Sequence, residues 1–377
     1  MPVNLPRALP ALWKKGLLLW GLGTGDIAHT GPIFVDLHLT NRCNLNCRCC
    51  VYHSPNAQAN PTSPQAADLP YARVKELFRE LKAMGTASIV LQGAGEPLLH
   101  PQALDIIALA KRHGFETILL TNGTLLNEDK INSMIDSRHD LIKIALWATS
   151  PEEYAMNYPG TSSQMLETVQ NNFKLAARLK RERSSRLPLV YWHYPINAHN
   201  WRSLDRLVEL AHAAGCDGVT FAPLCQSQKV DPSNALEPDE TGQIVAALQQ
   251  IGKRMNRLGM RHNVPQVVFR YRTGEEVWRS QACYIAWYHA HMRVDGRVQP
   301  CARCADVFGN LAETNFKEIW NNATAREFRR RTRTRDGVAS MQSECECRYC
   351  CYTIENARIE RIYAPVTRFA KAARGDA

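Results

Sequence analysis

The stretch that decides the fold, residues 33–50, reads IFVDLHLTNRCNLNCRCC. Its apolar first part, Ile33–Leu39, predicts a buried strand, and the loop that follows carries Cys43, Cys47 and Cys50 in the spacing C-x3-C-x2-C. Three thiolates packed into eight residues can hold three corners of an iron–sulfur cube, because each iron takes one thiolate. A fourth iron would then stay open to another ligand. The spacing therefore favours an iron–sulfur cluster that does more than pass electrons.

Closely spaced cysteines have other roles in proteins, and each is an alternative to an iron–sulfur cluster here. The 13 cysteines could bind zinc, form disulfides or lie buried as small hydrophobic residues. Their odd number and the lack of a secretory signal argue against a disulfide framework. Zinc sites usually pair two C-x2-C knuckles or add histidines, and only His53 lies close to this loop. We therefore expect iron–sulfur chemistry in a cytoplasmic protein, with zinc as the open alternative.

The loop resembles the cluster motif of the radical S-adenosylmethionine (radical SAM) superfamily, in which C-x3-C-x2-C follows the first strand of a barrel. One position departs from the family pattern: the residue before the last cysteine is commonly aromatic, and here it is Cys49. The resemblance implies a 4Fe-4S cluster on Cys43, Cys47 and Cys50, with S-adenosylmethionine (SAM) on the open iron. Cys49 could compete with Cys50 as a ligand, although its register does not match the family.

The order of apolar runs predicts an α/β fold. Helical patterns separate the runs, as in Val74, Leu77, Phe78 and Leu81, so the strands should form a parallel sheet with right-handed crossovers. Six strands fit the partial (β/α)6, TIM-like barrel typical of radical SAM proteins, while periodicity alone leaves a doubly wound sheet open. The predicted strands are 33–39, 88–91, 117–120, 142–146, 189–194 and 219–221.

We divide the chain of 377 residues into five parts, since its length exceeds that of a usual single domain. No apolar run reaches the ~20 residues of a membrane span. The run Ala11–Leu22 comes closest, and because lysines interrupt it we expect a helix packed on the barrel rather than a membrane anchor. The parts are an N-terminal helical segment (1–30), the barrel (31–225), a linker with helices (226–282), an auxiliary iron–sulfur domain (283–351) and a basic C-terminal helix or tail (352–377).

The net charge of +10 is partly local, because six arginines fall between Arg326 and Arg335. Such runs are typical of a solvated helix face, which is our prediction here. The alternative is an anionic partner: an acidic peptide, a phosphorylated sugar or a nucleic acid. Nucleic acid is the weakest of the three, since no aromatic-rich RNA-binding motif accompanies the arginines.

A glycine-rich turn, Gly93-Ala94-Gly95-Glu96-Pro97, follows the second strand, where the absence of side chains lets a ligand approach the backbone. It resembles the GGEP motif of radical SAM enzymes, which implies that these five residues bind the methionyl amino group of SAM. At the end of strand four the family often has Ser-Leu-Asp, and that pattern is missing here. We expect Asn122, Thr149 or Ser150 to take its place, while Trp147 either stacks on the ligand or belongs to the core.

Strand five offers the candidate catalytic residues. Because side chains alternate along a strand, Tyr191 and His193 share one face, while Trp192 and Tyr194 share the other. One of these faces should line the substrate cavity. His193 and Tyr194 are therefore candidates for an acid or base, although a lone histidine is more often structural.

A second set of cysteines lies in the C-terminal third. Twelve residues, Gly296 and four more residues separate Cys283 from Cys301, and the knuckle Cys347-Arg-Tyr-Cys350 follows later. This resembles the SPASM/twitch extension of radical SAM enzymes and implies one auxiliary 4Fe-4S cluster on these four cysteines. A zinc ribbon is the alternative. Three further cysteines stay unassigned and two are expected to be buried near strand six: Cys304, Cys345 and Cys351, then Cys216 and Cys225.

The resemblance implies an enzyme. A flavodoxin- or ferredoxin-like donor would reduce the first cluster, SAM would be cleaved to methionine and a 5′-deoxyadenosyl radical, and that radical would take a hydrogen from the substrate. The auxiliary cluster would accept the substrate's electron. We expect a small molecule, such as a carbohydrate or aminocyclitol, to be oxidised, because only about thirty residues precede the first strand. The alternatives are a maturase that crosslinks or epimerises a ribosomally made peptide and, more remotely, a non-catalytic iron–sulfur electron carrier.

Overall fold

The computed structural model describes residues 11–55, 67–224, 231–274, 281–341 and 350–362. One sheet of ten strands runs through these residues in the order β10-β9-β8-β1-β2-β3-β4-β5-β6-β7. Strands β1 to β7 are parallel to their neighbours, and β8 is parallel to β1. The strands are β1 Phe34–His38, β2 Ser88–Gln92, β3 Glu116–Thr121, β4 Leu141–Ala145, β5 Leu189–Ile196, β6 Gly218–Pro223, β7 Arg261–His262, β8 His289–Met292, β9 Arg297–Gln299 and β10 Gly309–Asn310.

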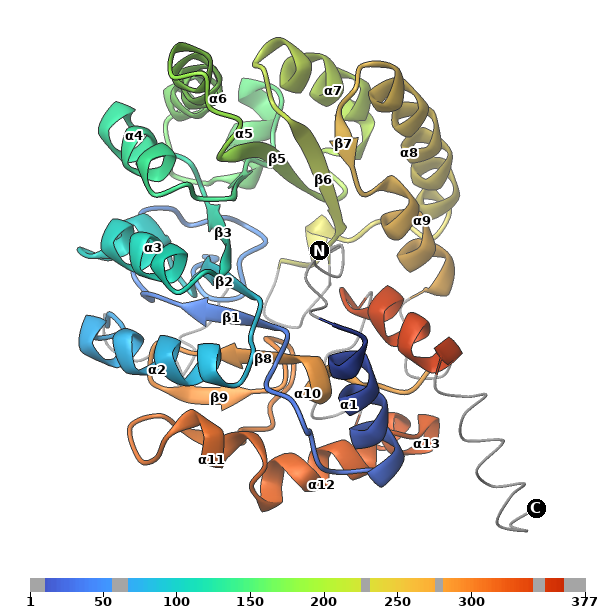
Figure 1. Ribbon diagram of the computed structural model, residues 1–377. Coiled ribbons are helices and arrows are strands. Elements are labelled where there is room, and N and C mark those ends of the chain that lie inside the picture. Colours follow the sequence, from blue (N-terminus) through green and yellow to red (C-terminus); the bar gives the residue numbers. More distant parts are fainter. Residues whose placement is uncertain (1–10, 56–66, 225–230, 275–280, 342–349, 363–377) are drawn as a thin grey trace.

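The consecutive strand order confirms the partial (β/α)6 barrel. A doubly wound sheet would reverse direction at a switch point, and no reversal occurs between β1 and β6. Figure 1 shows the helices that connect these strands as an outer layer around a curved sheet. The helices of this unit are α2 Tyr71–Ala83, α3 Ala103–Arg112, α4 Glu128–Asp136, α5 Pro151–Asn157, α6 Gln164–Glu182, α7 Leu204–Ala213, α8 Glu240–Arg257 and α9 Val264–Thr273.

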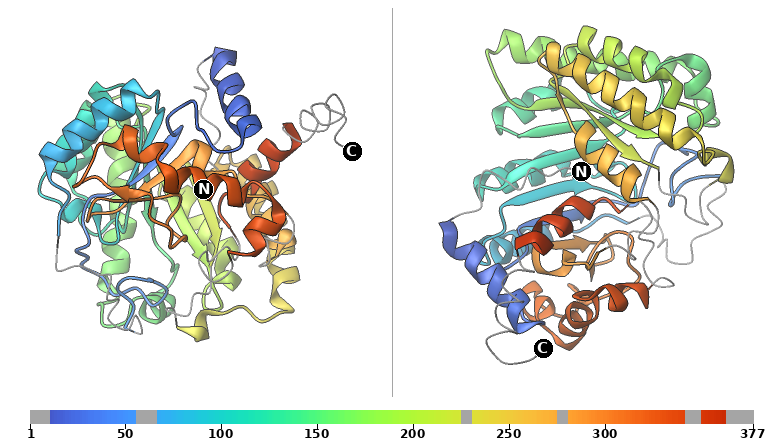
Figure 2. Two further views of the ribbon diagram at one scale, coloured as in Figure 1. Left: turned by 90° about the horizontal axis from the view of Figure 1, so that it is seen from below. Right: turned by 90° about the vertical axis from the view of Figure 1, so that its right-hand side faces the viewer.

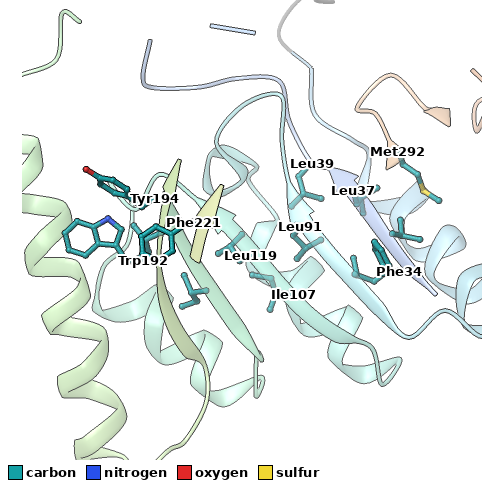
Figure 3. Close-up of a cluster of buried hydrophobic side chains, with 14 of the residues drawn as sticks. Phe34, Leu37, Leu39, Leu91, Ile107, Leu119, Trp192, Tyr194, Phe221 and Met292 are labelled. Carbon is teal, nitrogen blue, oxygen red and sulfur yellow. The ribbon is translucent and has the colours of Figure 1, made fainter. Parts of the chain in front are cut away.

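The apolar core lies between the strands and this outer layer of helices (Figure 3). Helix α2 buries the predicted face of Val74, Leu77, Phe78 and Leu81. On β5, Trp192 is fully buried and stacks on Phe173 of α6 with ring centroids 4.8 Å apart. Alternation along each strand then turns the other set of side chains toward the inside of the barrel.

The C-terminal third extends the same sheet. Strand β8 pairs with β1 in parallel, Phe34 opposite His289, and a hairpin through Gly296 leads to β9. Helix α1 packs against α10, and both lie beside the C-terminal helices (Figures 1 and 2). No helix among the described residues is long and apolar enough to cross a membrane. The helices here are α1 Ala11–Thr24, α10 Ile285–Tyr288, α11 Phe316–Trp320, α12 Ala323–Thr332 and α13 Arg335–Ala339, and residues 353–362 are also helical.

The prediction of a solvated arginine face is wrong for Arg329, which is fully buried in α12. Its guanidinium lies 4.8 Å from the ring centroid of Trp320 and donates to the carbonyl oxygens of Trp320 and Ala286 at 2.7 and 3.0 Å. It also donates to the Asp26 carbonyl at 3.2 Å. Arg326 and Arg330 form ion pairs with the Asp26 carboxylate. These contacts hold α12 to the segment after α1, because a guanidinium can satisfy several acceptors at once.

Candidate metal centres and cofactor site

The cysteine loop, Thr40–Cys50, leaves the carboxyl end of β1 with three half-buried thiols. Burial raises the pKa of Cys47, and the neighbouring Cys50 and Cys43 thiols raise it further, so the three sulfurs share one site. The Sγ of Cys50 accepts the backbone N–H groups of Tyr52 and His53 at 3.4 and 3.3 Å. Such N–H donors stabilise negative charge on a sulfur ligand. A set of thiols that burial makes costly to ionise suits a site where metal supplies the positive charge.

The placement of the thiols does not by itself distinguish a cluster from a single ion. Among the residues that the structure describes, no three His, Cys, Asp or Glu side chains are placed to hold a metal ion. The choice of a cluster rests on the spacing of Cys43, Cys47 and Cys50 in the sequence.

Cys49 is buried against Asn197, the residue that follows β5. It is 5% exposed, and the side-chain amide of Asn197 donates to its Sγ at 3.6 Å. The same amide donates to Asn157 of α5 at 2.7 Å. Burial raises the pKa of Cys49 to about 12. Cys49 therefore fills a buried polar contact between α5 and the end of β5.

The glycine turn, Gly93–Pro97, packs directly on the base of the cysteine loop. Gly95 N–H donates to the Thr40 carbonyl at 3.1 Å, and Glu96 N–H donates to the Arg42 carbonyl at 2.8 Å. A Cβ on Gly95 would lie 1.9 Å from the Arg42 carbonyl oxygen, and one on Gly93 would lie 2.8 Å from that of Thr40. These glycines are therefore needed for the close approach of two backbones, a reason that the sequence did not reveal.

Glu96 fixes the turn to the third strand. Its buried carboxylate accepts the Thr121 hydroxyl at 2.6 Å and the backbone N–H groups of Asn122 and Leu98 at 2.7 and 3.1 Å. The Asn122 side chain donates to Asn44 of the cysteine loop at 2.8 Å. The structure thus brings the predicted turn, Asn122 and the three thiols together at the carboxyl edge of β1, β2 and β3, the edge where parallel barrels carry their active sites.

Three of the four predicted auxiliary cysteines are described, and they lie close together. Burial raises the pKa of Cys283 and of Cys301 to about 12, and nearby thiols add to both shifts. The Cys350 thiol raises the pKa of Cys301, and the Cys351 thiol, which the sequence left unassigned, raises the pKa of both Cys283 and Cys301. Cys347 and Cys345 lie outside the described residues, as does Cys225. Cys304 and Cys216 are buried.

Comparison with known proteins identifies the domains. Residues 37–187 match the family model of the radical SAM superfamily, and residues 283–352 match that of SPASM, an iron–sulfur cluster-binding domain. The chain carries a radical SAM domain. The second match confirms the C-terminal SPASM-type domain.

The relatives of this radical SAM protein are distant. The AdoMet-dependent heme synthase of Methanosarcina barkeri is 22% identical over 334 residues, which cover 85% of this chain and 90% of the relative. Streptococcus suis SuiB bound to S-adenosylmethionine has a TM-score of 0.61 at 12% identity, covering 80% of this chain and 68% of SuiB. The structure of anSMEcpe with bound AdoMet has a TM-score of 0.61 at 15% identity, covering 91% and 96%. These two likenesses show the fold.

The predicted residues after β4 cap a helix in this radical SAM barrel. The Thr149 backbone N–H and hydroxyl donate to the Glu153 carboxylate at 2.7 and 2.9 Å, and the Ser150 hydroxyl accepts the Glu153 N–H at 3.3 Å. Ser150 is thus the N-cap residue of α5, and Glu153 holds the residue before it. It places Thr149 and Ser150 at the end of β4, and a role of either in binding SAM stays a prediction.

His193 and Tyr194 lie on opposite faces of β5, as the alternation predicts. Tyr194 is fully buried and its hydroxyl donates to the Asn200 carbonyl at 3.0 Å, and it lies with Trp192 beside a helix in Figure 3. His193 Nδ1 lies 3.0 Å from the Thr220 hydroxyl. Burial, with Lys143 next, lowers the pKa of His193 to about 3, so its ring is neutral at pH 7.

Sequence reasoning missed a polar group that connects β1 to the second set of cysteines. The Asp36 carboxylate lies 3.3 Å from His289 Nε2 and accepts the Tyr352 hydroxyl at 3.3 Å, and Tyr352 follows Cys350 by two residues. Burial raises the pKa of Asp36, but His289 and its neighbours lower it more. The signal was present: Asp36 and His38 interrupt an apolar strand at alternate positions, as His289 and His291 do in β8.

Proposed function

We propose that this protein is a SAM-cleaving enzyme whose cysteine loop holds a 4Fe-4S cluster through Cys43, Cys47 and Cys50. The observation that carries the proposal is the pair of backbone hydrogen bonds between the glycine turn and the loop, at 3.1 and 2.8 Å. They fix a glycine-rich backbone beside three thiols at the carboxyl edge of a parallel barrel. When bound and reduced, the cluster supplies the electron that splits SAM into methionine and a 5′-deoxyadenosyl radical.

The chain's own residues bind and orient. Gly93 to Pro97 would hold the methionyl amino group of SAM, with Glu96 keeping the turn in place through its three accepted hydrogen bonds. Asn122, Thr149 and Ser150 lie at the ends of neighbouring strands and would contact the rest of the cofactor. His193, neutral and inside the barrel, can accept a hydrogen bond from a substrate. A flavodoxin- or ferredoxin-like protein would be the electron donor.

An auxiliary 4Fe-4S cluster on Cys283, Cys301, Cys347 and Cys350 would accept the electron that the substrate loses. The described thiols raise one another's pKa, which supports a shared site. Cys351 is a competing ligand, because its thiol raises the pKa of both Cys283 and Cys301.

The substrate is best proposed as a small molecule that is oxidised, such as a carbohydrate or aminocyclitol. The relative that aligns over 90% of its own length is a heme synthase, which makes a small molecule. SuiB bound to its precursor peptide keeps a peptide maturase as the second candidate, although that likeness reaches only the fold.

Metal analysis tests the two sites. Anaerobic reconstitution should give about eight irons per chain if both sites hold four-iron clusters. Four irons with zinc would reject the auxiliary cluster. Replacing Cys43, Cys47 and Cys50 with alanine should abolish formation of 5′-deoxyadenosine, whereas Cys216→Ala is a matched control at a buried thiol away from both sites. Persistent 5′-deoxyadenosine in the triple variant would reject the first cluster. Transfer of deuterium from a labelled compound into 5′-deoxyadenosine would identify the substrate.

A further inference from the structure

The inner face of the barrel carries polar side chains where a packed barrel has branched apolar ones. On β1, Asp36 and His38 alternate with Val35 and Leu37, so they share the face turned away from the helices. Residues paired across parallel strands share a face, so the strand register shows which other residues lie on the face of Asp36. On one side, Asp36 pairs with His291 of β8. On the other side, the paired residues are Val90, Ile118 and Leu141, and Lys143 lies two residues after Leu141 on the same face of β4. Ala145, again two residues on, pairs with His193 of β5. We call Asp36, His38, Lys143, His193 and His291 the lumen cluster.

Several members of the lumen cluster have buried polar atoms that no hydrogen bond reaches. Among the described residues, neither ring nitrogen of the fully buried His291 has a hydrogen-bond partner, nor has Oδ1 of Asp36. Lys143 is 4% exposed, and within the described part of the chain no hydrogen bond or ion pair reaches its ammonium. A buried polar atom without a hydrogen-bond partner destabilises the folded state, and a charged one does so more strongly. Such a concentration in one place is the mark of a ligand site rather than of a folding core.

The charges of the cluster define the ligand. Burial lowers the pKa of Lys143 to about 8, while Asp36 and Glu116 raise it, so the side chain is mostly cationic at pH 7. Burial lowers the pKa of His38 and of His193 to about 3, which keeps both rings neutral. Asp36 lies 3.3 Å from His289, and in the described part of the chain neither Asp36 nor Glu116 comes within ion-pair distance of the Lys143 ammonium. Lys143 is therefore a buried cation without a counter-ion in contact.

We propose that the lumen cluster binds a carboxylate group of the substrate, with the Lys143 ammonium as its charge partner and the neutral rings of His38 and His291 as hydrogen-bonding groups. This rests on the proposed function. One cation balances a monoanion, whereas a phosphate dianion would leave a second buried charge uncompensated. Lys143 lies inside β4, two residues before its end, while the cysteine loop and the glycine turn lie beyond the ends of β1 and β2. The carboxylate would thus be held below the edge at which SAM binds, and the rest of the substrate would extend up toward the radical.

The first test compares two buried lysines in the ligand-free holoprotein. Lys180 of α6 is 9% exposed and forms an ion pair with Asp217 at 2.5 Å, so it is the matched structural control. Lys143→Met removes an unpaired buried charge and should raise the melting temperature by about 2–4 °C. Lys180→Met leaves Asp217 without its partner and should lower it. If Lys143→Met lowered the melting temperature as much as Lys180→Met does, Lys143 would be a structural lysine and the proposal would be overturned.

The second test measures the ligand directly, with butyrate as the probe and butyramide as its neutral match. Reductive methylation with formaldehyde and cyanoborohydride modifies only the neutral amine, so a bound carboxylate protects Lys143 by holding it protonated. At pH 8, butyrate at 50 mM should slow methylation of Lys143 at least threefold, read by peptide mass spectrometry, while butyramide has no effect and exposed Lys253 is unchanged. Equal rates with and without butyrate, or equal protection by butyramide, would overturn the proposal.

A third arm separates the substrate from the cofactor, because SAM also carries a carboxylate. SAM alone, added to the unreduced holoprotein at 1 mM, should leave methylation of Lys143 unchanged. Protection by SAM would assign Lys143 to the cofactor and overturn the substrate proposal. Formation of 5′-deoxyadenosine by the unmodified enzyme tests the proposed function separately. A failure of SAM cleavage can therefore be distinguished from a failure of carboxylate binding at Lys143.

Discussion

Replacing Gly95 with alanine should separate the glycine turn from the cysteine loop. The new Cβ would lie 1.9 Å from the Arg42 carbonyl oxygen, and contacts under 3.0 Å are essentially never seen, so the two backbones would have to part by about 1.1 Å. That shift breaks the hydrogen bonds that Gly95 and Glu96 donate to Thr40 and Arg42. Two bonds at about 0.5–1.5 kcal/mol each give a loss of about 1–3 kcal/mol in the free energy of unfolding.

The effect on activity should be larger than the effect on stability. A displacement of roughly 1 Å between cofactor-binding groups costs on the order of 100-fold in rate. We expect Gly95→Ala to retain iron in the second site and to form 5′-deoxyadenosine about 100-fold more slowly, measured by anaerobic chromatography with dithionite as reductant. Gly242→Ala is the matched control, because nothing lies within 4 Å of its Cβ position in α8. Wild-type rates in Gly95→Ala would refute the close approach as the reason for this glycine.

Three further predictions concern single residues. Cys49→Ala should keep the iron content of the first site and Cys50→Ala should lose it, so equal loss in iron assays would make Cys49 a ligand. Arg329→Met should lower the free energy of unfolding by about 3 kcal/mol or more, since it strands several buried carbonyls, whereas exposed Arg330→Met should change it by less than about 0.5 kcal/mol. Burial lowers the pKa of His139 to about 4, so the unfolded chain takes up a proton before the folded chain does as the pH falls. The free energy of unfolding should therefore decrease by about 2 kcal/mol between pH 7 and pH 5. In urea unfolding, His139→Gln should show a smaller decrease over the same pH range.

The first six strands could be predicted because each is an apolar run between helical patterns. The run 33–39 became β1, Phe34–His38, and the run 219–221 became part of β6, Gly218–Pro223. Strand β8 could not be found in this way. Its four residues alternate between histidine and apolar side chains, and only its pairing with β1 makes it a strand.

The burial of charged residues also could not be predicted from the sequence. Arg329 reads as part of a solvated run, and its burial depends on acceptors more than forty residues away at Ala286 and about three hundred away at Asp26. Lys143 interrupts an apolar strand, which is a visible signal, but that no described residue forms an ion pair with it emerges only in three dimensions. The cysteine spacings, in contrast, are local, so both sets of thiols could be proposed from the sequence, and their roles as ligands stay predictions.

The direct pairing of β8 with β1 has a mechanical consequence. The cysteine loop follows the carboxyl end of β1, whereas Cys283 precedes the amino end of β8, and these two strands are hydrogen-bonded neighbours with Asp36 opposite His291. Any electron that passes between the sites therefore crosses a distance that one continuous sheet fixes, with no hinge between them, so its rate should not depend on solvent viscosity. For the same reason the C-terminal part cannot be trimmed away as an accessory: its removal would leave β1, the strand that carries the cysteine loop, as a bare edge.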